Sequence, residues 1–502
     1  MKVKQHLFSI SKNLDSLLVA LAGFVLIQIF SNHSGIGVSP DSVTYLSASR
    51  HLATGGGFRS FDQLPVVDFP VGYPVFLTII SFFTRLDPLL YGSWLNGILF
   101  GILLYTCGSM MNGFYQRNGW YKRILLVCIL FSPALQEVYS MLWSETIFLL
   151  LILFFIISIS NFIREMKMKW LFVAAIICSI ACLDRYAGIF MVPVGVSLIF
   201  FNQRDPLHKR LMRCLLFSGI SLSLFLINII RNYFLTGFLM GQRQKGDLSF
   251  FRIIEYFGGV FCDWILVGRM PGVAVMLTLA VLVIFSLTIF FTYKHRQANY
   301  EIEYASAAIG LMYCVFMLLS SFLTRYEQFT NRLLAPMFIP LLWSLSWWIP
   351  GFIGRRSYRM KWISGFIFLL VAALFLNIQL AADYEYYDGV KDAGIPGYRE
   401  DEFTQSGIVQ FVEKNKVIFD PHFPIYSNAP DAVYFITSLP AIQLPQVVFP
   451  EKVRHYYESE NGYLVWFNDL ENPEMPKLDS ILQKKNMLLL KQVPDGAVYF
   501  SK

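Results

Sequence analysis

The sequence predicts an all-α polytopic membrane protein with a small α/β domain at its C-terminal end. The first observation is the composition, because 55% of the 502 residues are hydrophobic and only 15% are charged, whereas a soluble domain carries about 25% charged residues. The second is that long apolar runs recur up to residue 380 and then stop. The same composition excludes disordered, collagen-like and disulfide-rich proteins.

Eleven apolar stretches account for the membrane part. A helix needs roughly 20 apolar residues to cross about 30 Å of hydrocarbon, and stretches that meet or approach this length are interpreted as spans. The first follows a basic N-terminus, as in a signal anchor, and no small-residue cleavage site follows it, so we expect it to be retained. The predicted spans are Leu14–Phe30, Leu89–Met111, Ile124–Leu135, Thr146–Ile163, Trp170–Ala181, Gly188–Phe201, Leu215–Ile230, Val273–Thr292, Ala305–Leu323, Leu333–Trp348 and Trp362–Leu380.

Basic residues are concentrated in the short connections between these spans. Residues 1–380 contain 30 basic and 16 acidic side chains, a balance of +14, while residues 381–502 contain 11 and 18, a balance of −7. Basic loops stay on the cytoplasmic side, so we expect a cytoplasmic N-terminus and, after eleven crossings of the inner (plasma) membrane, an extracytoplasmic C-terminal domain. Lys and Arg do not cluster as in nucleic-acid-binding proteins, so no nucleic-acid partner is expected.

The chain is therefore divided into two predicted domains. Residues 1–380 form the transmembrane domain, and its long extracytoplasmic loops, residues 31–88 and 231–272, are the expected place for function. Residues 381–502 lack apolar runs and alternate short strand-like and helix-like pieces, which is typical of a small α/β domain. All seven cysteines precede residue 381 without the spacing of metal ligands, so we interpret them as small apolar side chains.

Carboxylates in the apolar part lie at the ends of predicted spans. Asp41 follows Pro40 at the start of a helix-like segment, Asp68 lies in a proline-rich stretch, and Glu145 opens a long apolar helix. Each has an ordinary explanation: a helix cap or first-turn acid for Asp41 and Glu145, and a solvated loop charge for Asp68. On the predicted topology all three lie on the outer side, which indicates an acid-lined cavity near that face of the membrane.

Several arginines and a tyrosine are predicted to lie on the same side. Any one of these arginines is also explained as a side chain that extends to the membrane surface, and Arg185 is also explained as an ion-pair partner of Asp184. Together they would form a site for an anion such as phosphate, because the guanidinium group matches phosphate in geometry. The members of this group are Arg185, Tyr186, Arg231, Arg243 and Arg332.

The order of these motifs resembles that of the GT-C superfamily of membrane glycosyltransferases, which use polyprenyl-phosphate-linked sugars. The sequence is most similar to bacterial relatives of the protein mannosyltransferases and of the lipid A aminoarabinose transferase, over about residues 14–345. Some relatives carry a lysine after the second acid, where this chain has Phe69. The matching residues are Asp41 with Tyr45, Leu46, Ala48 and Gly55 to Gly57, Asp68 before Pro70 and Gly72 to Pro74, Glu145, Arg185 to Gly188, and Arg231 with Asn232.

The resemblance implies a GT-C fold and an inverting transfer of a sugar to a hydroxyl of an envelope lipid, a glycan or a protein. It implies that Asp41, Asp68 and Glu145 are catalytic, with Asp41 as the base. It also implies that the donor phosphate is bound by Arg185, Arg231, Arg332, Arg243 and Tyr186. No organic cofactor is expected. The same three carboxylates are candidate ligands for a divalent cation, Mg²⁺ or Mn²⁺, which prefer oxygen ligands.

A transporter or flippase of lipid-linked sugars is the alternative function. Such a protein would share a cavity lined with arginines, but it would be expected to carry charges near the middle of the membrane or paired broken helices. The sequence places almost no charged side chain there. The distribution of charge therefore favours an enzyme over a transporter.

Overall fold

The computed structural model describes residues 13–501 except 115–118, 266, 295–299, 326–327, 355–357, 471 and 473. The basic N-terminus and parts of the basic connections that predict the orientation lie outside these residues. Contacts divide the described chain into two compact units. The helical unit contains residues 13–30, 67–73 and 93–388, and the mixed unit contains residues 31–66, 74–92 and 389–501.

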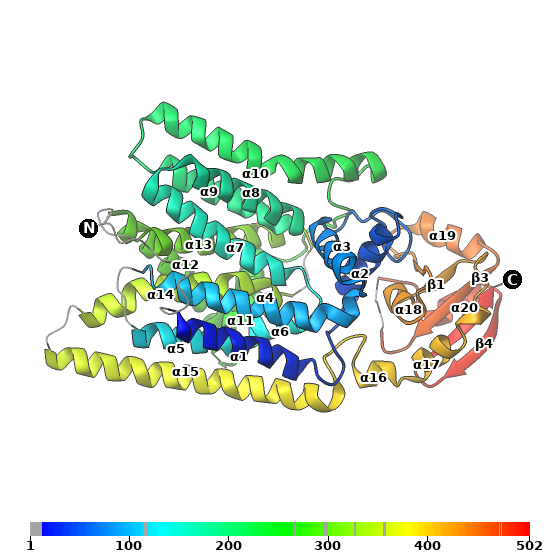
Figure 1. Ribbon diagram of the computed structural model, residues 1–502. Coiled ribbons are helices and arrows are strands. Elements are labelled where there is room, and N and C mark those ends of the chain that lie inside the picture. The colour runs from blue at the N-terminus through cyan, green and yellow to red at the C-terminus, as the bar shows by residue number, and fades with distance from the viewer. Residues whose placement is uncertain are drawn as a thin grey trace. The chain divides into compact units, whose positions relative to one another are not determined.

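The helical unit consists of apolar helices, most of which run side by side in Figure 1. The N-terminal end of α4 and the C-terminal end of α15 belong to the mixed unit. The helices are α1 (Leu14–Phe30), α4 (Pro88–Met111), α5 (Gly119–Leu130), α6 (Pro133–Ser140), α7 (Glu145–Glu165), α8 (Met168–Asp184), the 3-10 helix η2 (Tyr186–Phe190), α9 (Met191–Phe200), α10 (Leu207–Thr236), α11 (Phe250–Trp264), α12 (Pro271–Lys294), α13 (Glu301–Leu323), α14 (Asn331–Gly354) and α15 (Tyr358–Ala393).

Every predicted span lies within one helix or two consecutive helices. Among the described residues, seven helices are long and apolar enough to cross a membrane, or eight if the bent pair α5 and α6 forms one span. The predicted span Ile124–Leu135 is divided because Pro133 cannot occupy a helix interior; α6 begins at that proline, bent by 49° from α5. The chain is a multi-pass membrane protein, and eleven crossings remain a prediction.

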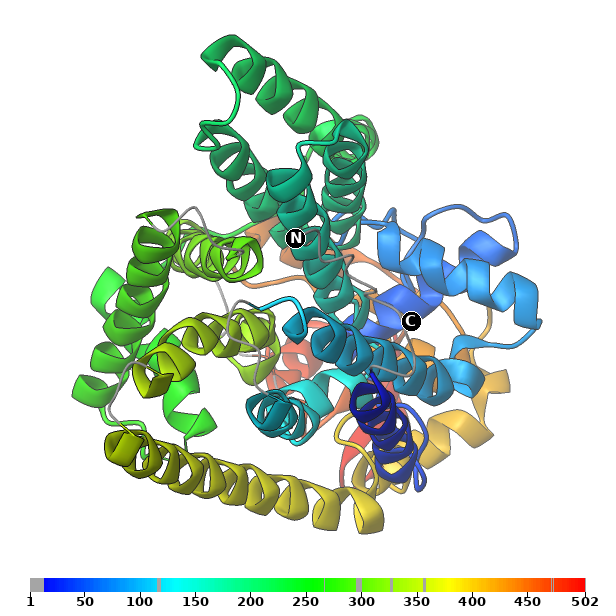
Figure 2. The same cartoon turned by 60° about the vertical axis from the view of Figure 1, so that its left-hand side comes forward.

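Burial distinguishes the centre of the helical unit from its edge. In an apolar stretch of 18 residues within α7, 78% of the residues are buried, whereas in the corresponding stretch of α15 only 6% are buried. The exposed side chains in the middle of α15 are nonetheless mostly apolar, Trp362 and Phe366 among them, as expected for a helix that faces lipid. Helix α15 lies at the margin of the helical unit in Figure 2. The interior position of α7 buries Glu145 at its first turn.

The mixed unit is built on a five-stranded sheet with the order β2-β1-β3-β5-β4. Strand β1 is parallel to β2 and β3, while β5 is antiparallel to β3 and β4. The predicted small α/β domain is therefore present. Its elements are α2 (Pro40–Ala53), α3 (Gly72–Thr84), α16 (Asp401–Thr404), α17 (Gly407–Lys414), η3 (Lys416–Ile418), β1 (Ile425–Ser427), α18 (Pro430–Thr437), β2 (Ile442–Gln443), α19 (Pro450–Glu458), β3 (Gly462–Phe467), α20 (Leu478–Lys484), β4 (Met487–Val493) and β5 (Gly496–Ser501).

Helix α2, which carries Asp41, belongs to the core of the mixed unit. Val43 is fully buried in one apolar cluster with Val433 of α18 and Val465 of β3. The backbone N–H of Tyr398 donates to the carbonyl oxygen of Val38 at 2.9 Å, just before α2. The sequence-based division at residue 381 thus separates segments that share one hydrophobic core, and residues 31–66 group with the C-terminal residues.

Candidate functional site

Glu145 is held between two arginines from distant parts of the helical unit. Its side chain is 1% exposed. Arg332 Nε at the start of α14 lies 2.5 Å from Glu145 Oε1, and Arg185 Nη1 lies 2.6 Å from Oε2. Since both oxygens accept from guanidinium groups, the role of a simple first-turn acid does not account for this residue.

The surroundings fix the orientation of both guanidinium groups. Arg185 Nη1 also donates to Ser144 Oγ at 2.8 Å, and the Arg332 guanidinium carbon lies 4.2 Å from the centre of the Trp143 ring. The two arginine side chains remain 19% and 16% exposed. Taken by themselves, these two guanidinium groups and the Glu145 carboxylate carry one net positive charge, and the carboxyl groups of Glu137 and Asp184 lie within electrostatic reach of them. Fixed guanidinium groups suit bidentate recognition of phosphate. This group of Arg185, Glu145 and Arg332 is named the arginine clamp below.

The break between α8 and η2 places Arg185 and its neighbour. Helix α8 ends at Asp184, and Arg185 is extended, with φ −141° and ψ 137°, before η2 begins. An extended residue turns successive side chains to opposite sides. Arg185 therefore joins Glu145, while Tyr186 enters a second set of contacts.

Tyr186 fixes the segment that carries Asp68. Its hydroxyl donates to the carbonyl oxygen of Val67 at 2.8 Å and accepts from Asn228 Nδ2 at 3.3 Å and from Asn232 Nδ2 at 2.9 Å. One donor and two acceptor positions are all that a tyrosine hydroxyl offers. The structure thus gives Tyr186 a positioning role, and its predicted contact with phosphate would have to replace one of these bonds.

Asp68 lies beside the loop that follows α10. Arg243 Nη2 donates to the backbone oxygen of Asp68 at 2.9 Å, and Arg243 Nε donates to Met240 at 3.1 Å. The surrounding protein raises the pKa of the Asp68 carboxyl although its side chain reaches solvent, and the charge of Arg243 opposes this rise. Arg231 Nη1 donates to Asn232 Oδ1 at 3.0 Å in the same network.

The helical unit thus brings together seven of the eight predicted site residues. The adjacent residues Arg185 and Tyr186 connect the arginine clamp with the contacts around Asp68. Sequence reasoning missed Asn228, although it lies four residues before Asn232 and therefore on the same face of α10. That spacing was the available signal.

We expect replacement of Gly241 by alanine to impair this site specifically. Gly241 has φ +72°, and an added Cβ would lie 1.7 Å from Asp68 Oδ1, so the carboxylate must turn away. Gly237 in the same segment has φ +77°, and a Cβ there meets nothing within 4 Å. Both substitutions cost about 1–2 kcal/mol of backbone strain, but only Gly241→Ala should reduce the sugar transfer that the sequence resemblance implies. Equal turnover of the two variants would contradict the placement of Asp68 in the site.

Asp41 occupies the first turn of α2 in the mixed unit. The cap of this helix is Ser39, whose side chain accepts from the backbone of Ser42, while the Ser42 hydroxyl accepts from the backbone of Ser39. Asp41 is therefore not the capping residue, and its carboxylate is half-buried.

Two residues of the C-terminal segment lie near Asp41 and were not predicted. The Tyr398 hydroxyl donates to Asp431 Oδ2 at 2.5 Å, in the first turn of α18, which packs against α2. Burial raises the pKa of the Asp431 carboxyl, the Tyr398 hydrogen bond opposes this, and the nearby charge of Asp41 raises it further. No local sequence signal marks this pair, because Tyr398 and Asp431 lie 33 residues apart and Asp431 approaches Asp41 across 390 residues of chain.

Removal of the Tyr398 hydroxyl should lower the stability of the protein by an amount that depends on pH. Tyr398→Phe removes the side-chain donor of the half-buried Asp431 carboxylate and leaves it only the backbone donors of Asp431 and Ala432, which costs about 1–3 kcal/mol at pH 7. Because the lost bond stabilises the ionised carboxylate, the deficit is full above the folded-state pKa of Asp431. The loss of stability becomes smaller as the pH falls toward about 3.9, the ordinary pKa of an aspartate carboxyl. Thermal unfolding at pH 7 and near pH 4 measures this, and a deficit that grows on acidification would contradict the assignment.

The arrangement of Glu145 does not favour a metal ligand. A divalent cation would have to displace a guanidinium group from one of its two oxygens. In the part of the chain that the structure describes, no group of three or more His, Cys, Asp or Glu side chains is arranged to hold a metal ion. Cation binding by Asp41, Asp68 and Glu145 therefore stays a prediction from the sequence.

Comparisons with known proteins identify the fold. No protein-family model and no curated protein matches this sequence. The crystal structure of ArnT from Cupriavidus metallidurans bound to undecaprenyl phosphate is similar, with a TM-score of 0.59 and 13% identity over 96% of this chain and 97% of that chain. The apo form of the same protein gives a TM-score of 0.57 and 14% identity over 98% of both chains.

A cryo-EM structure of the mycobacterial arabinofuranosyltransferase AftD is similar over 98% of this chain but only 42% of its own length, with 11% identity and a TM-score of 0.47. The argument for the fold therefore depends on ArnT, which matches this chain over nearly its whole length. This chain has the fold of ArnT, which confirms the GT-C fold that the sequence resemblance implies.

Proposed function

We propose that this protein is a glycosyltransferase that moves a sugar from a polyprenyl-phosphate-linked donor to an acceptor hydroxyl. The observation that carries the proposal is the arginine clamp, in which a buried carboxylate orients two partly exposed guanidinium groups. The similarity to ArnT, whose crystal structure contains undecaprenyl phosphate, supports the same class of ligand. The charge pattern of the connections supports an active site at the outer face of the plasma membrane.

The chemistry follows from where charge develops. The acceptor oxygen attacks the anomeric carbon, its proton passes to Asp41, and the bond between that carbon and the phosphate oxygen breaks. The departing phosphate gains negative charge in the transition state, and the arginine clamp stabilises that charge. One displacement of this kind inverts the anomeric configuration, by analogy with inverting glycoside hydrolysis.

Arg231 and Arg243 complete the proposed donor site. Both lie among the contacts around Asp68 and Tyr186, and Tyr186 directly follows Arg185 in the chain. Asp68 orients this part of the site. Arg243 provides a further positive charge for the single phosphate group of the donor. The acceptor is a hydroxyl of an envelope lipid, a glycan or a protein.

The direct test uses undecaprenyl phosphate, the product common to donors of any sugar. The purified protein should bind this lipid, and Arg185→Gln and Arg332→Gln should each weaken binding about tenfold or more, because a charge-assisted hydrogen bond contributes about 1.5–3 kcal/mol. Arg252→Gln is the matched control, since the exposed Arg252 side chain pairs with Glu255 within α11. Unchanged binding in both clamp variants would contradict the proposal.

Turnover separates an enzyme from a transporter. In liposomes that contain a lipid-linked sugar fraction and an acceptor extract, the enzyme should release undecaprenyl phosphate and glycosylate the acceptor. Movement of the intact donor across the membrane without either product would favour a flippase instead.

We expect chelation to leave undecaprenyl phosphate binding by the arginine clamp unchanged. The physical reason is that guanidinium groups, which occupy both oxygens of Glu145, supply the positive charge. Binding is measured with and without EDTA, followed by added Mg²⁺ or Mn²⁺. Loss on chelation and recovery with the cation would instead support the predicted metal site.

A further inference from the structure

A pocket lies at the C-terminal end of α7, the end opposite to Glu145 of the arginine clamp. It has a volume of about 310 Å³ and is lined by the C-terminal ends of α7, α9 and α12, by residues 201–204 and by the start of α13. Ile163 in its wall is 18 residues after Glu145, which corresponds to about 27 Å along α7. The pocket is therefore separate from the candidate functional site, at the other membrane surface.

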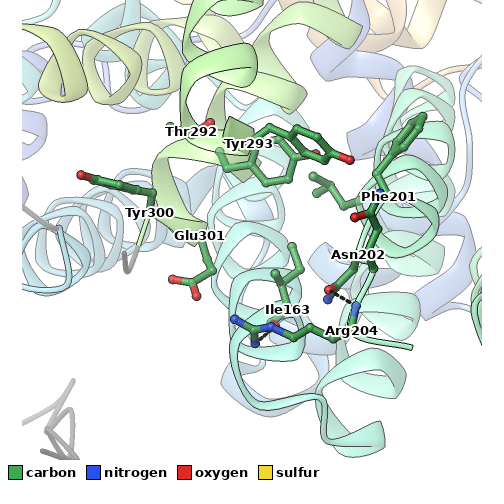
Figure 3. A pocket seen from close by; sticks show the side chains of 11 residues that line it. Ile163, Phe201, Asn202, Arg204, Thr292, Tyr293, Tyr300 and Glu301 are labelled. Carbon is green, nitrogen blue, oxygen red and sulfur yellow. Dashed lines mark hydrogen bonds between the residues drawn. The ribbon is translucent and has the colours of Figure 1, made fainter. Parts of the chain in front are cut away.

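One basic and one acidic side chain face this pocket. Arg204 Nη1 donates to the carbonyl oxygens of Ile163 and Arg164 at 2.8 and 2.9 Å, which anchors the guanidinium group at the end of α7. Glu301 is half-buried at the start of α13, and the positive charges of Arg164 and Arg204 act on its carboxylate. Figure 3 shows its carboxylate on the same side of the pocket as the Arg204 guanidinium group.

The rest of the wall is aromatic and apolar. Tyr293 and Tyr304 have ring centres 6.4 Å apart, and the Tyr300 ring packs edge-on against Trp347 at 4.0 Å. Leu198 and Ile163 provide apolar surface. Tyrosine is typical of the membrane interface, where its ring contacts lipid and its hydroxyl contacts water.

We infer that this pocket binds the headgroup of a zwitterionic phospholipid that carries a primary ammonium group, a phosphoethanolamine lipid. Arg204 provides donors for the phosphate, and the Glu301 carboxylate accepts from the ammonium group. The apolar wall contacts the start of the acyl chains. An anionic headgroup without an amine would place negative charge beside Glu301 with no ammonium group to balance it, which is unfavourable in a half-buried site.

The bound lipid would connect two groups of helices. Its phosphate contacts the connection after α9, and its ammonium group contacts α13, so it links α7 and α9 with α12 and α13. Binding to the folded state alone raises stability. This role does not depend on the proposed sugar transfer.

The test measures lipid binding to the delipidated full-length protein in detergent micelles. Thermal unfolding and native mass spectrometry are recorded with phosphatidylethanolamine, its N-methylated series up to phosphatidylcholine, and phosphatidylglycerol. We expect phosphatidylethanolamine to bind about tenfold more tightly than phosphatidylcholine or phosphatidylglycerol, the value of one charge-assisted hydrogen bond. Soluble O-phosphoethanolamine should bind more weakly than the lipid, because it lacks the acyl chains.

Two variants test which side chain contacts the ammonium group of the lipid and which contacts its phosphate. Glu301→Gln should abolish the preference for phosphatidylethanolamine over phosphatidylcholine, and Arg204→Gln should weaken both. Lys209→Gln, an exposed change in α10 at the same end of the helices, is the control. Equal binding of phosphatidylglycerol, equal binding across the methylated series, or equal binding of the soluble ester would overturn the inference. The lipid series on the unaltered chain decides this even if a variant fails to fold.

Discussion

Replacing Glu145 by glutamine will cost the protein about 3–5 kcal/mol of stability and most of its affinity for undecaprenyl phosphate. The side chain is 1% exposed and lies 2.5 and 2.6 Å from two guanidinium nitrogens. An amide cannot compensate two positive charges, so Arg185 and Arg332 would repel each other in a partly buried position. Their guanidinium groups would then lose the orientation that suits phosphate.

Thermal unfolding in detergent and lipid binding measure the two effects. The matched control is Glu165→Gln at the other end of α7, where the carboxylate pairs with exposed Lys167 at 2.9 Å. Surface pairs of this kind contribute only about 0–1 kcal/mol. If Glu145→Gln bound undecaprenyl phosphate more tightly than the unaltered chain, Glu145 would act as a repelling charge rather than as the group that orients the clamp.

Replacing Asp41 by asparagine will reduce sugar transfer by about 10²- to 10⁴-fold, the usual contribution of a general base. The change keeps the shape of the side chain and leaves the Ser39 cap of α2 in place. We therefore expect normal folding and normal binding of undecaprenyl phosphate, since the proposed phosphate ligands belong to other segments.

Initial rates with a lipid-linked sugar fraction and acceptor extract measure this loss. Asp62→Asn is the control from the same loop, where the carboxylate accepts from the backbone of Leu64 at 2.9 Å. Full turnover of Asp41→Asn would exclude Asp41 as the base, while the arginine clamp would still be open to test through lipid binding.

The sequence predicts the helices well because membrane insertion depends on local composition. Nine of the eleven predicted spans fall inside one helix, and Leu14–Phe30 coincides with α1. The division of Ile124–Leu135 shows where this reasoning fails. A hydropathy argument counts apolar side chains, but Pro133 ends a helix for a steric reason.

The functional contacts are less predictable because they depend on tertiary structure. The residue types around the site follow from the motifs, but the pairing of Glu145 with Arg332 joins positions 187 residues apart. Tyr186 is a predicted phosphate ligand whose hydroxyl is engaged by Val67 and two asparagines. A hydroxyl can serve either role, and only its neighbours decide which.

The shared core of α2 and the C-terminal strands has a consequence for protein engineering. Residues 389–501 are not a detachable module, because their removal would expose the buried face of Val38 and Val43 to water. A chimaera that exchanges this tail for that of a protein with the same fold should therefore also exchange residues 31–66. Any change of acceptor preference made in this way would alter the setting of Asp41 at the same time.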